Sequence, residues 1–95
     1  MPLSAIPALS IVRNQTAAYT ASSAAISNAV GDGVSVVRLV ATSACHIKVA
    51  VTPVATSSDM LLPANTVQYI AIAPGQKVAA IQNSAGGTLH VTEMC

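Results

Sequence analysis

The sequence predicts an all-β fold, a small antiparallel β-sandwich or jelly-roll-like barrel with an extended N-terminal arm. Short runs rich in β-branched residues recur at roughly ten-residue intervals, turn residues separate them, and no convincing helical pattern intervenes. Parallel βαβ units are excluded because each crossover needs about a dozen residues. A chain of 95 residues fits one domain overall. We expect an extended arm with weak strands over residues 1–30 and an antiparallel β-domain over residues 31–95.

The first thirty residues carry the weakest signal. They are rich in Ala and Ser, and an Ala-rich helix over residues 17–30 is conceivable from the high helix propensity of Ala. Ser, Thr and Asn side chains in the same stretch compete for backbone hydrogen bonds, which disfavours that helix. We therefore predict an arm that leads into two weak strands, at residues 16–21 and 24–29.

From Gly31 onwards the pattern of strands and turns is stronger. "GDG" is a tight turn before a strand at residues 34–41, and "CHIKVAV" alternates strictly, which predicts a half-buried strand at residues 45–51. "MLL" is a short strand, "PAN" a turn, "TVQYIAIA" a strand, "PGQ" a turn and "KVAAIQ" a strand. "NSAGG" is expected to close a hairpin with "TLHVTEM", whose Leu89 and Val91 face inward while His90 and Thr92 face outward.

Composition limits both the core and the partners. The chain is 53% hydrophobic but only 2% aromatic and 7% charged. Because Ala buries far less surface than an aromatic side chain, we expect a thin core that is supplemented by contacts with other chains. Four cations against three anions give a net charge of +1, too little for nucleic-acid binding by counterion release. Sparse surface charge is typical of a protein held in an assembly.

Few residues could carry chemistry. His46, His90 and Glu93 could form a metal site only if their strands were neighbours, and the close ligand pairs typical of zinc are absent. Cys45 and His46 point to opposite faces of a strand, which excludes a nucleophile and base pair. We expect no enzymatic activity, metal, cofactor or small-molecule substrate.

Neither a membrane nor a secretory segment is expected. The longest apolar region, residues 34–54, contains charged residues and alternates, and "MPLSAIPALS" lacks a basic start. Cys45 is expected to be buried and Cys95 to be a free thiol on a tail, although an intermolecular bond through Cys95 stays open.

The surface of the chain is the feature that predicts a role, namely binding to other proteins. Flat faces of small uncharged side chains, open strand edges and an arm that drapes over a neighbour suit a permanent assembly. Partner contacts are expected from the arm and from the two tyrosines, although Tyr69 could also lie in the core. The candidate partner-binding residues are Ile6, Leu9, Ile11, Arg13, Tyr19 and Tyr69.

A resemblance narrows the class of assembly. The elements "VRLVAT", "PVATSSDMLLPA", "YIAIAPGQKVAAIQ" and "GTLHVTEM" lie within residues 36–94. This region, about two thirds of the chain, resembles a group of short virion structural proteins of tailed bacteriophages and prophages. The resemblance implies a location in the virion, with passage through the host cytoplasm during assembly.

Within that class, small all-β proteins serve as capsid decoration, or cement, proteins. The resemblance then implies binding to the major capsid protein at the junctions of its subunits, on the phage head, as a dimer or trimer of identical chains. A neck, tail or fibre-associated virion protein is one alternative. A host-surface glycan-binding module is another, disfavoured by the shortage of aromatic residues that could stack on sugars.

Overall fold

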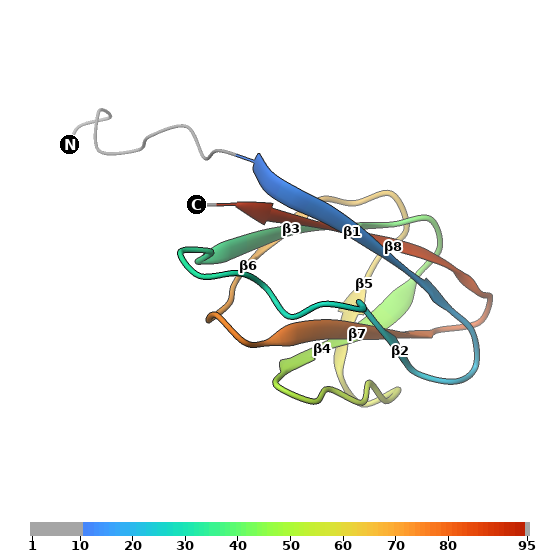
Figure 1. The fold of residues 1–95 in the computed structure, drawn as a ribbon. Coiled ribbons are helices and arrows are strands. Elements are labelled where there is room, and N and C mark those ends of the chain that lie inside the picture. Colours follow the sequence, from blue (N-terminus) through green and yellow to red (C-terminus); the bar gives the residue numbers. More distant parts are fainter. Residues whose placement is uncertain (1–10, 95) are drawn as a thin grey trace.

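Two antiparallel four-stranded sheets pack face to face in the computed structural model of this protein, which describes residues 11–94 (Figure 1). The strand order is β1-β8-β3-β6 in the first sheet and β2-β7-β4-β5 in the second. The all-β sandwich predicted from the sequence is therefore confirmed, and no helix lies within these residues. The strands are β1 (Ile11–Tyr19), β2 (Ala24–Ala25), β3 (Val36–Ala41), β4 (Cys45–Ala50), β5 (Met60–Leu62), β6 (Gln68–Ala71), β7 (Lys77–Gln82) and β8 (Gly87–Met94).

Alternation along the strands builds the core. In β3, three small or branched side chains at alternate positions, Val37, Leu39 and Ala41, are fully buried, and the residues between them are half-exposed. The inward phases of β4, β7 and β8 meet this row from the two sheets. The shared core contains one aromatic ring, that of Tyr19, and is otherwise built of aliphatic side chains and Cys45. The core is thus nearly free of aromatic side chains, in keeping with the composition.

The turns at "APGQ" and "PAN" form at the positions that the sequence predicts. In "APGQ" the amide of Gln76 donates to the carbonyl oxygen of Ala73 at 3.1 Å, and Gly75 has a φ of 90°. That combination, with Pro74 before the glycine, is typical of a type II turn. Asn65 in "PAN" has a φ of 56°, a conformation that Asn tolerates better than most residues. These turns fix the ends of β5, β6 and β7.

The connections between strands differ from the expected hairpins. "NSAGG" links β7 in the second sheet to β8 in the first, so the predicted hairpin there is wrong. Only β4 and β5 are both consecutive in the chain and hydrogen-bonded to each other. The other connections within residues 11–94 cross between the sheets. A turn that ends a strand is compatible with either outcome, because its local sequence does not specify which sheet receives the next strand.

The first described strand is longer than the sequence predicts. β1 starts at Ile11 rather than at residue 16 and pairs with β8 from Ile11 to Tyr19, with a bulge near its start. The second predicted strand, residues 24–29, is reduced to β2, two residues paired with β7. Ile11 and Arg13 therefore belong to the sandwich and not to an arm. Ile6 and Leu9 lie outside the described residues.

Close packing at one end of the sandwich requires a residue without a side chain. A Cβ at Gly87 would lie 2.7 Å from Thr42 Oγ1, 2.7 Å from the Tyr19 hydroxyl and closer still to Ser43 Oγ. The Ser43 hydroxyl is in turn held by the carbonyl oxygens of Ala85 and Gly86, at 3.2 and 2.9 Å. These atoms cannot all move aside without losing hydrogen bonds.

Gly87→Ala is therefore expected to destabilise the protein by about 1–3 kcal/mol, the usual cost of overpacking. Urea unfolding followed by circular dichroism measures this change. Gly31→Ala is the matched control, because a Cβ there meets no heavy atom within 4 Å and should leave stability nearly unchanged. Equal unfolding midpoints for the two variants would contradict the packing argument.

Candidate interaction surface

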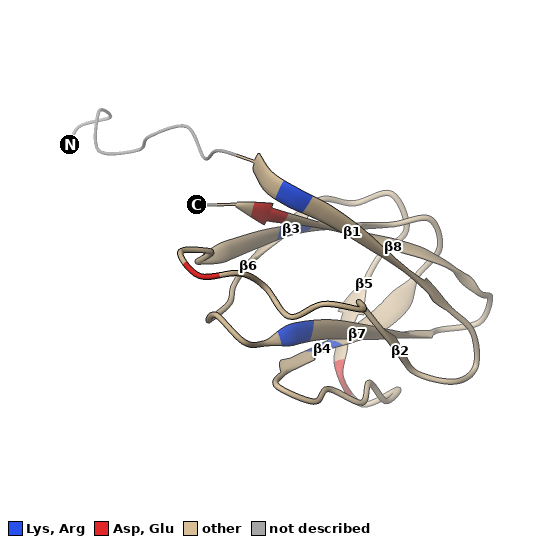
Figure 2. Cartoon of the chain, in the orientation of Figure 1, with Lys and Arg blue, Asp and Glu red and all other residues tan. Residues whose placement is uncertain are grey.

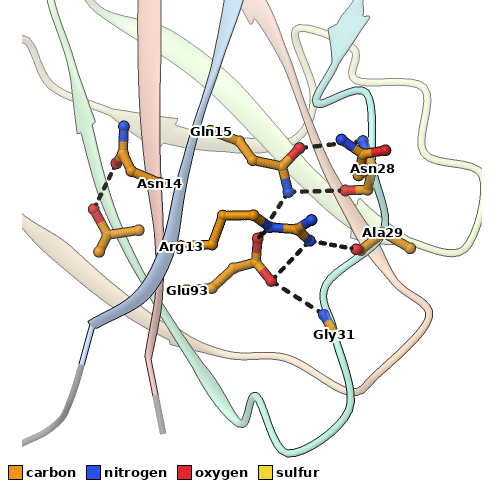
Figure 3. Close-up of polar contacts among 8 residues, drawn as sticks. Arg13, Asn14, Gln15, Asn28, Ala29, Gly31 and Glu93 are labelled. Carbon is orange, nitrogen blue, oxygen red and sulfur yellow. Dashed lines mark hydrogen bonds and ion pairs between the residues drawn. The ribbon is translucent and has the colours of Figure 1, made fainter.

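A buried carboxylate anchors one side of the sandwich (Figure 3). Arg13 of β1 and Glu93 of β8 are cross-strand partners, and the Glu93 side chain is fully buried. Arg13 Nε donates to Glu93 Oε2 at 2.6 Å and its terminal nitrogen donates to Oε1 at 3.1 Å. This two-point contact suits the planar guanidinium group.

Further donors complete the carboxylate's environment. Gln15 Nε2 donates to Glu93 Oε2 at 2.8 Å, and the amide of Gly31 donates to Oε1 at 3.1 Å. Gln15 also bonds the backbone of Asn28 in both directions, at 3.0 and 3.1 Å, and Arg13 donates to the carbonyl oxygen of Ala29 at 2.9 Å (Figure 3). The cluster thus ties β1 and β8 to the segment between β2 and β3. Arg13 was expected to bind a partner, and the structure engages its charge within the chain.

The protonation of Glu93 follows from these contacts. Burial by itself raises the pKa of this carboxyl group, but hydrogen bonds from Arg13, Gln15 and Gly31, together with the Arg13 charge, outweigh it. The pKa of Glu93 is therefore lower than its ordinary value. The buried group is an anion at neutral pH, and its role is structural.

Tyr19 lies in the core and not on the surface. Its ring is 1% exposed, its hydroxyl donates to the carbonyl oxygen of Ser43, and the Ser43 amide donates to that hydroxyl at 3.2 Å. The expectation that Tyr19 contacts a partner therefore needs correction, because a buried ring presents no surface. Tyr19 follows the inward phase of β1, a phase that the Ala-rich sequence does not reveal.

Large apolar side chains are exposed near the strands that border each sheet. Ile11, at the start of β1, is 71% exposed, and Tyr69 on β6 is 54% exposed. Both were expected to contact a partner, and both are available on the surface to do so. Tyr69 is therefore not a core residue. The full set of exposed large apolar residues is Ile11, Val12, Val51, Val54, Met60, Leu61, Val67 and Tyr69.

Residues 11–94 show neither a metal-binding cluster nor a pocket. They contain no group of three or more His, Cys, Asp or Glu side chains that could hold a metal ion, and no pocket opens among them. Burial raises the pKa of the Cys45 thiol, only partly opposed by Tyr19, so the reactive thiolate is disfavoured. His90 is exposed on β8. No helix in this part of the chain is long and apolar enough to cross a membrane.

His46 is more constrained than its outward position suggests. Its Nδ1 lies 3.0 Å from the carbonyl oxygen of Asp59, and its Nε2 lies 3.0 Å from Asn83 Oδ1. Asp59 in turn accepts a hydrogen bond from the Thr56 amide at 2.7 Å. These contacts fix the loop before β5 against β4.

The buried polar cluster around Glu93 was not predicted from the sequence. One signal was present, because Glu93 continues the inward phase of Leu89 and Val91 in "TLHVTEM". A charged residue at an inward position is rarely buried without a partner. Its partner Arg13 lies 80 positions away, and nothing in the sequence identifies that pairing.

Acid is expected to destabilise the protein mainly through Glu93. The folded-state pKa is lowered, so its stabilising effect is fully present above the ordinary pKa of 4.5 and is lost as pH falls through the folded-state value. Glu93→Gln should lower the free energy of unfolding at pH 7 by about 1.5–3 kcal/mol, as expected for hydrogen bonds to a charged group. It should also flatten the acid limb. Chemical unfolding between pH 7 and pH 2 measures both effects.

Asp32→Asn is the matched control for this experiment. It removes one negative charge from an exposed loop position with no hydrogen bond from its side chain to another described residue. Its unfolding curves should follow those of the wild type at every pH. A Glu93→Gln variant that retains the wild-type acid limb would refute the assignment.

Comparisons with known proteins identify no relative. No family model, no curated protein sequence and no solved structure matches this chain.

Proposed function

We propose that this protein is a structural component of a bacteriophage virion and acts as a capsid decoration, or cement, protein. In this role it binds the major capsid protein where capsid subunits meet, as an oligomer of identical chains, and stabilises the head. The virion assignment rests on the resemblance of residues 36–94. The observation that best supports a binding role is a sandwich without a pocket, whose surface carries exposed apolar side chains and few charges.

The distribution of charge is consistent with a surface that another protein covers. Figure 2 shows only a few, scattered charged segments on the ribbon, with no concentration of one sign. Arg13 and Glu93 compensate each other, and Lys48 lies 4.0 Å from Asp59. A surface of this kind avoids the cost of desolvating unpaired charges when another protein covers it.

The physical basis of the proposed activity is linkage. A protein that binds the closed shell better than separated subunits stabilises the shell by its difference in affinity for the two states. On a lattice, many copies multiply a modest individual affinity. The chain then needs no chemistry, only a rigid fold and contact surfaces.

A glycan-binding module is a weaker candidate. Tyr69 is exposed on the outer face of the first sheet beside its cross-strand partner Arg38, an arrangement that could accept a sugar ring. Tyr19 is buried, which leaves Tyr69 as the one aromatic platform among residues 11–94. Loss of cell-surface binding by a folded Tyr69→Ala variant would favour this function over the virion role.

Cryo-electron microscopy of the intact particle tests the proposed location. A decoration protein should occupy the outside of the head at subunit junctions, in copies on the order of hundreds, as lattice binding requires. A neck, tail or fibre-associated protein should instead form a ring or spike of about a dozen copies or fewer. Density confined to the neck or tail would overturn the decoration assignment and retain a virion role.

Deletion of residues 1–10 tests the predicted contribution of Ile6 and Leu9. We expect reduced attachment to particles that lack the protein, measured by co-sedimentation, with an unchanged unfolding midpoint. The deletion must stop before β1, because removal of Arg13 would leave the buried Glu93 without its ion pair. Replacement of residues 1–10 by a Gly/Ser segment of equal length separates loss of these side chains from loss of chain length. Wild-type attachment by both variants would exclude a contribution from this segment.

A further inference from the structure

We infer that the free edge of β1 pairs with β1 of a second copy, so that two first sheets join into one continuous antiparallel sheet. The proposal extends the identical-chain oligomer of the proposed function, and it can fail independently of the virion role. The strands that border the two sheets differ in length. β1 has nine residues, whereas the other border strands, β2, β5 and β6, have two, three and four.

The hydrogen-bonding direction of each β1 residue follows from the ladder. The Thr42 amide donates to the carbonyl oxygen of Thr88 at 3.0 Å, and the two continue the register of β3 with β8. Backbone groups alternate in direction along a strand, so even-numbered residues of β8 face β3 and odd-numbered ones face β1. Gln15 pairs with Val91. After the bulge, within residues 13–19 of β1, odd-numbered residues therefore bond to β8 and even-numbered ones direct their backbone groups to the free edge.

The free edge is both accessible and unprotected. The even-numbered residues after the bulge, Asn14, Thr16 and Ala18, are all exposed, and β8 is the one strand within residues 11–94 that pairs with β1. Natural proteins usually blunt such an edge with Lys, Pro or a very short strand. β1 contains neither Lys nor Pro, and its bulge lies near its start. Pro63 and Pro74, by contrast, lie close to the border strands β5 and β6.

The side chains of β1 favour a second copy as the occupant. In an antiparallel pair about a two-fold axis at Gln15, Asn14 of one copy lies opposite Thr16 of the other. The two Gln15 residues then face each other. This register is self-complementary, as a two-fold interface requires.

Charge also permits this pairing. Arg13 is the one charged residue of β1, and in this register it lies opposite Ala17, with its guanidinium group held by Glu93 of its own chain. No like charges therefore meet across the axis. Pairing at the edge uses backbone groups in the plane of the sheet. It therefore leaves the inward contacts of the Tyr19 and Gln15 side chains undisturbed. The cluster around Glu93 thus fixes β1 in the position that pairing needs.

Thr16→Pro tests the inference on the full-length protein. Proline removes the amide that would donate to the second copy but no amide that bonds to β8, and proline is tolerated at edges with this orientation. In sedimentation velocity across a concentration series, the wild type should dimerise. The variant should raise the dimer dissociation constant by about 30-fold or more, from the loss of two symmetry-related hydrogen bonds.

Ala71→Pro is the matched control. Ala71 is an exposed residue of β6, and the same alternation directs its backbone amide to the opposite free edge of the same sheet. This variant should dimerise like the wild type. Dimerisation through β6, or by stacking of sheet faces, would reverse or equalise the two results, and either outcome would overturn the inference.

Hydrogen exchange provides a readout that needs no substitution. In the wild-type dimer, the amides of Asn14 and Thr16 should exchange more slowly than at dilutions that favour the monomer, while the odd-numbered amides change little. A wild type that is monomeric throughout, or even-numbered amides that exchange equally fast at all concentrations, would refute the pairing. Attachment to phage heads by such a monomer would retain the decoration role and overturn the identical-chain oligomer.

Discussion

The position of β1 depends on one buried anion. Glu93 lies fully inside the sandwich, and an ionised carboxylate there is tolerated only because Arg13, Gln15 and the Gly31 amide surround it. Two of these donors come from β1 and one from the segment before β3. The same carboxylate therefore fixes the register of β1 on β8 and holds the connection between the sheets. In a core with so little aromatic surface, this specific polar contact defines a position that packing alone specifies weakly.

Tyr19 has the complementary role at the other end of β1. Its ring fills the core, and its hydroxyl bonds Ser43, whose own hydroxyl contacts the turn before β8. Gly87 must lack a side chain because these atoms converge on it. Between Arg13 and Tyr19, the inward positions of β1 thus carry an ion pair, an amide network and the one core aromatic. Long-range contacts at these inward positions hold β1 against β8.

These long-range contacts also explain what the sequence could and could not predict. β5 and β7 match their predicted bounds, because their ends are set by local turn residues such as Asn65 and Gly75. The strand order was not predictable, because the local sequence of the "NSAGG" turn is compatible both with a hairpin and with a connection between the sheets. β1 was underestimated because its β-structure is imposed by β8. Among the candidate contact residues, Ile11 and Tyr69 are exposed as a surface role requires, whereas Tyr19 fills the core, because Ala-rich flanks give no clear phase.

The two faces of β1 have different consequences for assembly. Gln15, Ala17 and Tyr19 bond to β8 through their backbone groups and direct their side chains inward, so this part of the strand is held in place. Asn14, Thr16 and Ala18 present unpaired backbone groups and uncharged side chains at the free edge of the first sheet. A rigid edge loses little conformational entropy when it pairs, whereas an edge that had to become ordered would lose more on binding. The contacts of Glu93 therefore stabilise the single chain and, in the proposed dimer, would hold the edge of β1 ready to pair. A substitution in the core can weaken assembly without touching the interface, which is why the edge must be tested at Thr16, where the backbone changes and the cluster does not.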